Sequence, residues 1–263
     1  MEENIIEVKN IHHSFGDQVI LNDISISIPK GRLVTITGPS GCGKSTLLKI
    51  LAGLIYPDSG SVTIEGIDVF SASRSKLFEM RKYFCFVFQD SALISNLNVF
   101  NNVALPLRYH YSLSEDEVEK RVLNILERCG IEGIRDALPA HLSLGQRKLV
   151  GFARGLVIEP RLIFLDEPVS GIDAIARKKM IDIIVSLRDD PEITLIVVSH
   201  NLDFIKEYAD YIALLYDKNL IAYGKRDEIL KSSNPILQSI LSIIVDEGEL
   251  VAKEVLGILK GEE

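Results

Sequence analysis

Long apolar runs are missing from this sequence. No uninterrupted apolar stretch reaches the ~20 residues that a helix needs to span a bilayer. The N-terminal segment Met1-Glu2-Glu3-Asn4 is acidic, whereas a secretory signal begins with basic residues, so we expect a cytoplasmic protein. Basic charge is also in deficit, because 29 Lys and Arg face 37 Asp and Glu. The net charge of −8 argues against general attraction to nucleic acid or anionic lipid.

Cysteine is scarce as well. The three cysteines, Cys42, Cys85 and Cys129, are an odd number without metal-ligand spacing, so we expect reduced thiols. The chain shows no internal repeat, low-complexity segment, sustained heptads or C-x-x-C pair. Its 263 residues suit one main α/β domain with an appended lobe, or two domains.

A glycine-rich segment at residues 38–46 is the most informative feature that is present. It follows the apolar run Leu33–Thr37, precedes a helix-like run, and matches the full G-x-x-x-x-G-K-[ST] pattern. Backbone N–H groups of such a loop wrap a triphosphate, and the helix N-terminus adds partial positive charge. Lys44 can reach the outer phosphates, and the Ser45 hydroxyl can bind Mg²⁺. The pattern favours a phosphate cradle over a plain glycine-rich turn.

Two later apolar strands end in candidate catalytic groups. Residues 162–165 run into Asp166 and Glu167, which predicts a buried parallel strand with two carboxylates at its carboxyl end. Asp166 would hold Mg²⁺, and Glu167 could polarise an attacking water. Residues 194–199 end at His200, which could contact the terminal phosphate or position the water. The alternative is a histidine that caps the helix beginning near Leu202.

Two further segments have weaker patterns. Residues 84–88 form a strand-like run that ends at Gln89. Ser143 and Gly145 stand at the start of a helical pattern, where they form either a second anion site or only an N-cap.

Taken together, these motifs resemble the ATP-binding cassette superfamily, the nucleotide-binding subunits of ABC transporters. The resemblance extends from Ile5 to about Gly224 and keeps the family's motif order and spacing. It implies that the chain binds ATP and Mg²⁺ and hydrolyses ATP. Residues 170–173 correspond to the D-loop, and Phe15 stands where the family stacks an aromatic ring on adenine. The implied site residues are Lys44, Gln89, Glu167 and His200 for catalysis; Phe15, Gly38, Pro39, Ser40, Gly41, Cys42, Gly43, Lys44, Ser45, Thr46, Ser143, Gly145 and Gln146 for nucleotide binding; and Ser45, Gln89 and Asp166 for Mg²⁺.

One departure from the family lies in its signature, which usually reads L-S-G-G-Q. This chain has Leu144 at the first glycine but keeps Ser143 and Gly145. In the family this segment reaches the ATP held by a second subunit. Leucine adds bulk there and disfavours positive φ, which predicts a slower site, or at the extreme an inactive one. Because Gln89, Glu167 and His200 are all retained, we expect a working ATPase.

The expected fold is α/β: a P-loop NTPase (RecA-like) core with an antiparallel β subdomain and an inserted α-helical subdomain. The expected domains are an ATPase domain at 4–224, with its helical subdomain at about 90–159, and a helical tail at 225–263. We expect antiparallel strands near residues 5–9, 19–28 and 61–64, and parallel strands at 33–37, 84–88, 162–166, 194–199 and 212–216. Expected helices are 44–52, 118–129 after a capping box at Ser114, 147–156, 175–188, 202–209, 227–232, 235–245 and 249–259.

Coupling to transport is the expected function. Chromosome and repair members of the superfamily carry long coiled-coil arms or zinc modules, and ribosome-linked members carry two cassettes. We expect a second cassette subunit, as a homodimer, and an integral membrane permease that holds the protein on the inner face of the membrane; no nucleic-acid partner is expected. The permease's coupling helix would meet Leu93, Ile94 and Leu97, unless these residues are core of the helical lobe.

The phrases around residues 91–108 and 233–235 are similar to the ATPases of Mla-type, Mce-associated phospholipid transporters. That resemblance implies lipid transport with an Mce-domain substrate-binding protein. Lipoprotein-releasing and amino-acid-type systems share parts of the pattern and stay open. A module that dimerises on ATP but hydrolyses it poorly, in a regulatory role, is the alternative that Leu144 suggests.

Overall fold

The computed structural model describes residues 3–244. The chain divides into two compact units, one made of Met1–Ser71 with Val197–Glu263 and the other of Ala72–Ile196. Within the described residues, no helix combines the length and hydropathy needed to cross a membrane.

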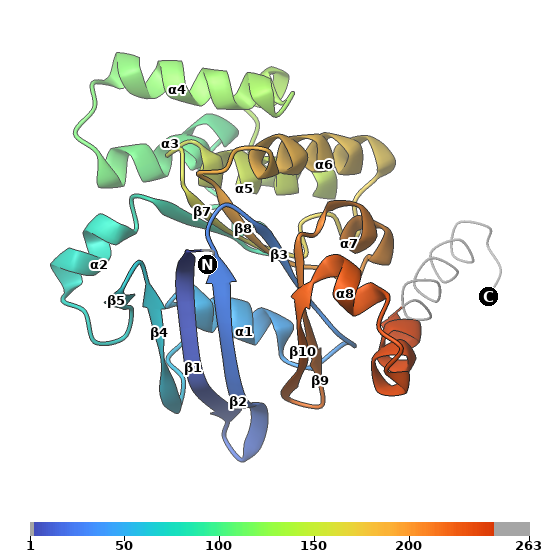
Figure 1. The fold of residues 1–263 in the computed structure, drawn as a ribbon. Helices are drawn as coiled ribbons and strands as arrows, with labels where there is room; N and C mark the ends of the chain where they lie inside the picture. Colours follow the sequence, from blue (N-terminus) through green and yellow to red (C-terminus); the bar gives the residue numbers. More distant parts are fainter. Residues whose placement is uncertain (1–2, 245–263) are drawn as a thin grey trace. The chain divides into compact units, whose positions relative to one another are not determined.

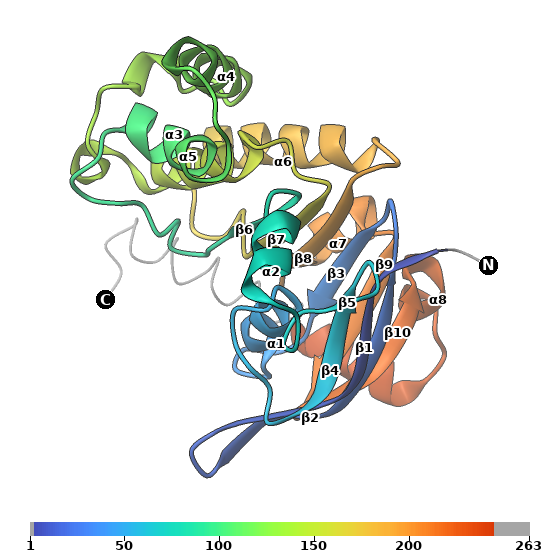
Figure 2. The ribbon, with the colours of Figure 1, turned by 90° about the vertical axis from the view of Figure 1, so that its left-hand side faces the viewer.

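The first unit contains a four-stranded antiparallel sheet. Its strands are β1 (Asn4–Phe15), β2 (Gln18–Pro29), β4 (Ser59–Ile64) and β5 (Ile67–Asp68), in the order β2-β1-β4-β5. Figure 2 shows β1, β2 and β4 side by side. Val8 lies opposite Ile26 on β2 and Val62 on β4, and all three are buried. The alternation of buried and exposed residues that indicated antiparallel strands is therefore confirmed.

A second, six-stranded sheet has the order β10-β9-β3-β8-β7-β6. Its strands are β3 (Leu33–Thr37), β6 (Phe84–Val87), β7 (Leu162–Asp166), β8 (Thr194–Val198), β9 (Tyr211–Tyr216) and β10 (Asn219–Lys225). Strands β3, β7 and β8 are buried along their whole length, which is why they read as continuous apolar runs. The division between the two units falls within β8.

Strand β10 was not predicted. It pairs antiparallel with β9 across a turn in which Asp217 and Lys218 both have positive φ. Such a turn matches the twist of a two-residue hairpin, but it lacks the usual Asn-Gly or Asp-Gly signal. Gly224, after which we expected the tail to begin, therefore lies inside this strand.

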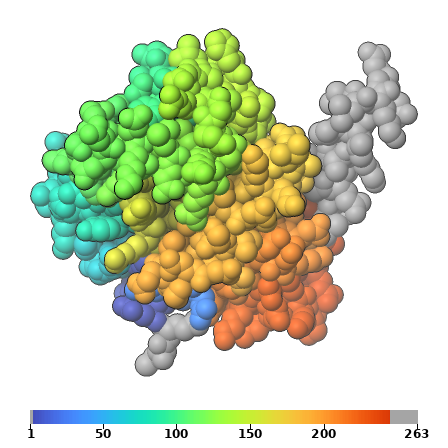
Figure 3. Space-filling view, turned by 90° about the horizontal axis from the view of Figure 1, so that it is seen from above, coloured from blue at the N-terminus to red at the C-terminus, as the bar shows by residue number. Residues whose placement is uncertain are grey.

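Helices dominate the second unit. They are α2 (Arg74–Met80), α3 (Val99–His110), α4 (Glu115–Arg128), α5 (Leu144–Leu156) and α6 (Ala174–Arg188), with short 3₁₀ turns η1 (Glu132–Ile134) and η2 (Pro139–His141). The stretch that we expected to be helical contains α3, α4 and α5, whereas α2 was not predicted (Figure 1). The side chains of the α3–α4 region, green in Figure 3, form a continuous surface.

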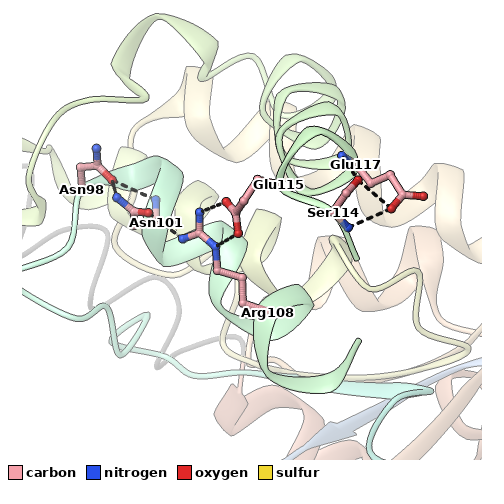
Figure 4. Close-up of polar contacts among 6 residues, drawn as sticks. All are labelled: Asn98, Asn101, Arg108, Ser114, Glu115 and Glu117. Atoms are coloured by element: carbon pink, nitrogen blue, oxygen red, sulfur yellow. Dashed lines mark hydrogen bonds and ion pairs between the residues drawn. The ribbon is translucent and has the colours of Figure 1, made fainter. Parts of the chain in front are cut away.

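Side-chain caps define the ends of α3 and α4 (Figure 4). Ser114 and Glu117 form the predicted capping box, with the Ser114 N–H donating to Glu117 Oε2 at 3.0 Å. Arg108 Nη2 donates to Glu115 Oε2 at 2.6 Å, and Arg108 Nη1 donates to Asn101 Oδ1 at 2.8 Å. Arg108 thus joins the last turn of α3 to the first turn of α4.

The remaining helices among residues 3–244 belong to the first unit. They are α1 (Lys44–Leu51), α7 (Leu202–Tyr208), α8 (Arg226–Leu230) and a helix over residues 235–244. In the last of these, Leu237, Ile240 and Ile244 pack in one buried cluster with Leu214 of β9. The helix expected at 249–259 lies outside the described residues.

Candidate nucleotide and catalytic site

The loop between β3 and α1 has the backbone geometry of a phosphate cradle. Gly38 has φ +148°, and a Cβ built there would lie 2.1 Å from the Leu215 carbonyl oxygen, so only glycine fits. Gly41 and Gly43 also have positive φ, of +77° and +100°. These conformations turn the chain tightly between a buried strand and the start of a helix, as the sequence pattern requires.

Positive electrostatic potential gathers at the start of α1. Its N-cap residue is Gly43, which has no side chain to cap the helix, and the first turn contains no acidic residue. The Lys44 Nζ donates to the carbonyl oxygens of Gly38 at 2.8 Å and Pro39 at 2.7 Å, which keeps the ammonium over the loop. A helix N-terminus without a side-chain cap, its dipole and one lysine together favour an anion.

Phe15 ends β1 with its side chain accessible. The residue is 55% exposed, and its ring packs edge-on against the buried His13, with centroids 4.8 Å apart. A half-exposed ring in such a T-shaped pair can still present a face to a flat partner such as a base. Phe15 therefore has the accessibility that the adenine-stacking prediction requires.

His200 follows β8 and is half-buried. The helix-capping alternative for this residue is wrong, because Asn201 is the N-cap of α7 and its Oδ1 accepts from the Phe204 N–H at 2.8 Å. His200 is thus not needed as a cap, which leaves the phosphate or water role as its proposed function.

In the second unit, Asp166 and Glu167 stand where β7 ends. Asp166 is the last strand residue and is 3% exposed, while Glu167 is 8% exposed. Glu167 has φ +49°, a left-handed conformation that is unfavourable for a residue with a Cβ. Such strain persists where the surroundings hold the backbone, which is common at functional sites.

Gln89 lies just beyond β6 and is exposed. Two and three residues after Gln89, Ser91 and Ala92 have positive φ of +65° and +44°. The Arg154 guanidinium of α5 donates to the Ser91 carbonyl at 2.7 Å and to the Ala92 carbonyl at 2.8 Å. Gly151 faces the same turn, since a Cβ there would lie 3.0 Å from the Ser91 Cβ. Helix α5 thus holds the loop that follows Gln89.

The signature segment forms the N-terminus of α5. The Ser143 Oγ accepts from the Gln146 N–H at 3.2 Å, and the Gln146 Oε1 accepts from the Ser143 N–H at 2.9 Å. Gly145 has no room for a side chain, because a Cβ would lie 2.6 Å from the Ala176 Cβ and 2.9 Å from the Asp173 Oδ2. Gly145 is therefore required for packing of α5 against the start of α6.

Leu144 does not adopt the positive φ that a leucine would disfavour. It is the first residue of α5, with helical backbone, and it is 42% exposed. A φ penalty at Leu144 is therefore excluded, and only the bulk of its side chain remains as a steric effect. That side chain lies beside Gly171, where an added Cβ would be 3.5 Å from the Leu144 Cδ2.

The three cysteines are free thiols, as expected. Burial raises the pKa values of both Cys85 and Cys129 to about 12, so these two thiols stay protonated and unreactive. Cys42 is half-buried in the phosphate loop.

Two cations on α5 were not predicted from the sequence, the buried Lys148 and the half-buried Arg154. Lys148 Nζ donates to the Glu167 carbonyl at 2.7 Å and to the Ser170 carbonyl at 2.8 Å. A signal existed, because Lys148 falls at helical spacing among the apolar residues that α5 buries, Leu149 and Phe152 among them. A lysine in such a stripe is unusual enough to predict partners.

The predicted site residues are thus divided between the two units. The first unit contains Phe15, the phosphate loop and His200. The second contains Gln89, Asp166, Glu167 and the signature residues Ser143, Gly145 and Gln146. A phosphate loop between a buried parallel strand and a helix defines a P-loop nucleotide-binding protein.

Comparison with known proteins gives the family. The model of the family described as ABC transporter matches residues 21–170, more than half of the chain. The intermembrane phospholipid transport system ATP-binding protein MlaF of Haemophilus influenzae is 36% identical over 89% of this chain and 89% of its own length. The probable ribonucleotide transport ATP-binding protein mkl of Mycobacterium leprae is 36% identical over 90% of this chain, and the chain covers 68% of the length of that relative. The chain covers 66% of the length of the Mycobacterium tuberculosis protein of the same name.

Among solved structures, the dimeric post-hydrolysis state of the ATP-binding cassette MJ0796, bound to ADP and Pi, superposes with a TM-score of 0.78. It is 31% identical and covers 84% of this chain and 98% of its own. The chain therefore belongs to the ABC transporter family, as an ATP-binding cassette with ATPase activity. The expected P-loop NTPase fold is confirmed.

Proposed function

We propose that this chain drives an Mla-type phospholipid transporter by ATP-dependent dimerisation on a membrane permease. The cradle geometry of residues 38–46 is the observation that supports ATP as the energy source. The MlaF name of a relative that matches along nearly its whole length supports phospholipid as the cargo. A ribonucleotide cargo is the second candidate, favoured by the name of the mycobacterial relative.

The first unit binds the nucleotide in this proposal. The loop N–H groups and the Lys44 ammonium take the phosphates, and Phe15 stacks on the adenine. His200 then donates to the terminal phosphate or orients the attacking water.

Mg²⁺ would be held by oxygen atoms of Ser45, Gln89 and Asp166. A hydroxyl, an amide and one carboxylate fit this ion, which prefers oxygen and binds through few protein carboxylates together with substrate phosphates. When bound, Mg²⁺ neutralises charge on the phosphates. Glu167 orients and polarises the attacking water as general base.

A second copy of the chain completes each site. In the proposed dimer Ser143, Gly145 and Gln146 approach the ATP of the other subunit, where the helix dipole at the start of α5 and its N–H groups outside the capping box favour an anion. The dimeric state of the cassette MJ0796 supports this arrangement. ATP then acts as a cyclic link that closes the pair, and hydrolysis reopens it.

The permease is proposed to dock on the loop after Gln89, at Leu93, Ile94 and Leu97. None of these three side chains is buried. The loop backbone is instead organised by Asn102, which is 0% exposed and whose Nδ2 donates to the carbonyls of Ile94 at 3.1 Å and Leu97 at 2.8 Å. A rigid backbone with accessible apolar side chains suits a docking site. The permease places the chain on the inner face of the membrane, and an Mce-domain protein would deliver or receive the lipid.

Glu167→Gln tests the ATPase assignment. The variant should bind ATP as the wild type does, lose turnover, and accumulate as an ATP-held dimer, because the amide cannot accept a proton from water. Nucleotide titration, phosphate release and size-exclusion chromatography with MgATP measure the three properties. Glu192→Gln, at an exposed position of the same unit, is the control. Normal turnover by Glu167→Gln would overturn the catalytic assignment.

Cargo is tested separately, with the chain and its permease reconstituted in phospholipid vesicles. ATP-dependent movement of a labelled phospholipid that the Glu167→Gln variant cannot sustain is the expected result. Movement of a ribonucleotide and not of phospholipid would favour the second candidate. If the chain dimerised on ATP but hydrolysed no ATP with either cargo, it would instead be the regulatory module that dimerises on ATP and hydrolyses it poorly.

A further inference from the structure

Lys148 is a buried cation with no part in the mechanism proposed above. It lies in the second turn of α5, the helix that begins directly after Ser143, and it is 5% exposed. Removing an ammonium from water is costly unless hydrogen bonds and opposite charge compensate. Its partners therefore show what this lysine does.

All three donors of the ammonium go to the turn that follows β7. Lys148 Nζ donates to the Glu167 carbonyl at 2.7 Å, to the Ser170 carbonyl at 2.8 Å and to the Ser170 Oγ at 3.1 Å. A lysine has three donors, so these contacts use its full capacity. The Ser170 hydroxyl in turn donates to the Glu167 carbonyl at 3.1 Å.

The residue held in this way is the one with strained backbone. Glu167 has φ +49° and is buried at the end of β7. Burial lowers the pKa of Lys148, while the carboxylates of Glu167 and Asp166 oppose that shift, so the ammonium is attracted by both. Hydrogen bonds and charge thus act together on one short turn.

We propose that Lys148 is a positioning residue, which holds the backbone of Glu167 so that its carboxylate is aimed at the attacking water. This inference rests on the catalytic role proposed for Glu167. Because Lys148 belongs to α5, the same contacts tie the turn of Glu167 to the helix whose first residues approach the partner's ATP. Gly145 makes that link stiff by close packing against Ala176.

Lys148→Met tests the proposal, since methionine keeps much of the length of the stem but donates no hydrogen bond. In the full chain, alone and with its permease, kcat should fall about ten- to a hundredfold, the usual effect of a misplaced catalytic group. The KM for ATP and the Kd of MgATP should change little, because the phosphate loop is untouched. Lys148→Arg keeps the charge and donors and should recover part of kcat.

Lys179→Met is the matched control. Lys179, exposed on α6, also donates to a backbone carbonyl, that of Gly130 at 3.0 Å, but it has no role in the proposed mechanism. A kcat of Lys148→Met equal to that of Lys179→Met would overturn the inference. A parallel loss of ATP affinity and kcat would also overturn it, because the lysine would then be purely structural.

The Glu167→Gln background separates the two proposals. Adding Lys148→Met there should lower turnover no further and leave the ATP-held dimer intact, because both changes act on one step. Normal turnover in Glu167→Gln alone would instead refute the role of Glu167. If circular dichroism shows Lys148→Met unfolded, Ser170→Ala removes the hydroxyl shared by Lys148 and Glu167, and a normal kcat there refutes the positioning role.

Discussion

Single residues set the chemistry of the phosphate loop. The Lys44 ammonium is held over the loop by the carbonyls of Gly38 and Pro39, so little rearrangement separates it from a bound phosphate. Gly38 has no substitute, because any Cβ would collide with the Leu215 carbonyl. The loop therefore requires glycine itself at position 38, and the lysine at position 44 supplies its positive charge.

Lys44→Ala should weaken ATP binding about ten- to a hundredfold, because a charge-assisted hydrogen bond contributes roughly 1.5–3 kcal/mol. Nucleotide titration on the full chain measures the change. Lys49→Ala, in the last turn of the same helix, is the control and should bind normally. Equal affinity of the two variants would remove Lys44 from the phosphate site.

Leu144→Gly should leave the nucleotide affinity of the monomer nearly unchanged and raise ATP turnover in the assembled complex. The reason is steric, since the leucine side chain is 42% exposed at the start of α5, where the proposed dimer brings two backbones together. Phosphate release by the complex measures the effect. An unchanged or lower rate would mean that the interface has adapted to leucine.

Among the elements, α5 makes contacts beyond the usual ones of a packed helix. Lys148 holds the turn of Glu167, Arg154 holds the turn of Ser91 and Ala92, and Ser143 begins the helix. Both turns contain non-glycine residues with positive φ, so each needs a partner to stay in place. One rigid helix therefore positions several segments with proposed functions.

Acid should weaken the start of α4. The Ser114 N–H and hydroxyl hold the pKa of Glu117 below its ordinary value of 4.5. A depressed carboxyl pKa contributes stability above the ordinary value, and that stability is lost as the pH falls through the folded pKa. The stability advantage of the wild type over Glu117→Gln should thus shrink as the pH falls below 4.5. Amide exchange of α4 measures it, with Glu119→Gln as control; an advantage independent of pH would contradict the prediction.

At the scale of the whole molecule, the proposed function depends on partners. Both the dimer and the permease contact are proposed to use surfaces of the second unit, the signature at the start of α5 and the loop after Gln89. Asn102 holds the backbone of that loop through hydrogen bonds, so the apolar side chains of the loop are not needed for that purpose and can contact the proposed partner.

Leu97→Asp should uncouple the chain from its permease. An unpaired charge buried in that contact costs several kcal/mol, which is enough to lose the complex. A pull-down with the permease measures binding, and circular dichroism with ATP titration checks the isolated variant. Ser95→Asp, exposed in the same loop, is the control. Loss of folding would show that Leu97 is internal packing, and a folded variant that still binds the permease would exclude this segment from the contact.

Much of this protein follows from the sequence alone. The phosphate loop, the strand before it and the capping box of Ser114 are local features, so residues within a few positions determine them. The strands β3 and β7 have the bounds expected from the sequence, because a strand buried on both faces is a near-continuous apolar run. The family followed from the order and spacing of such local motifs.

Contacts between distant segments were decided only in the tertiary structure. Strand β10 depends on its hairpin with β9, and the short α2 has too weak a pattern of its own. The sequence left open whether His200 caps α7, and only the structure shows that Asn201 is the cap. Lys148 is separated from Glu167 by 19 residues, and no local pattern pairs them. Burial of a charge becomes favourable only where the folded chain supplies acceptors, and their positions are a property of the whole fold.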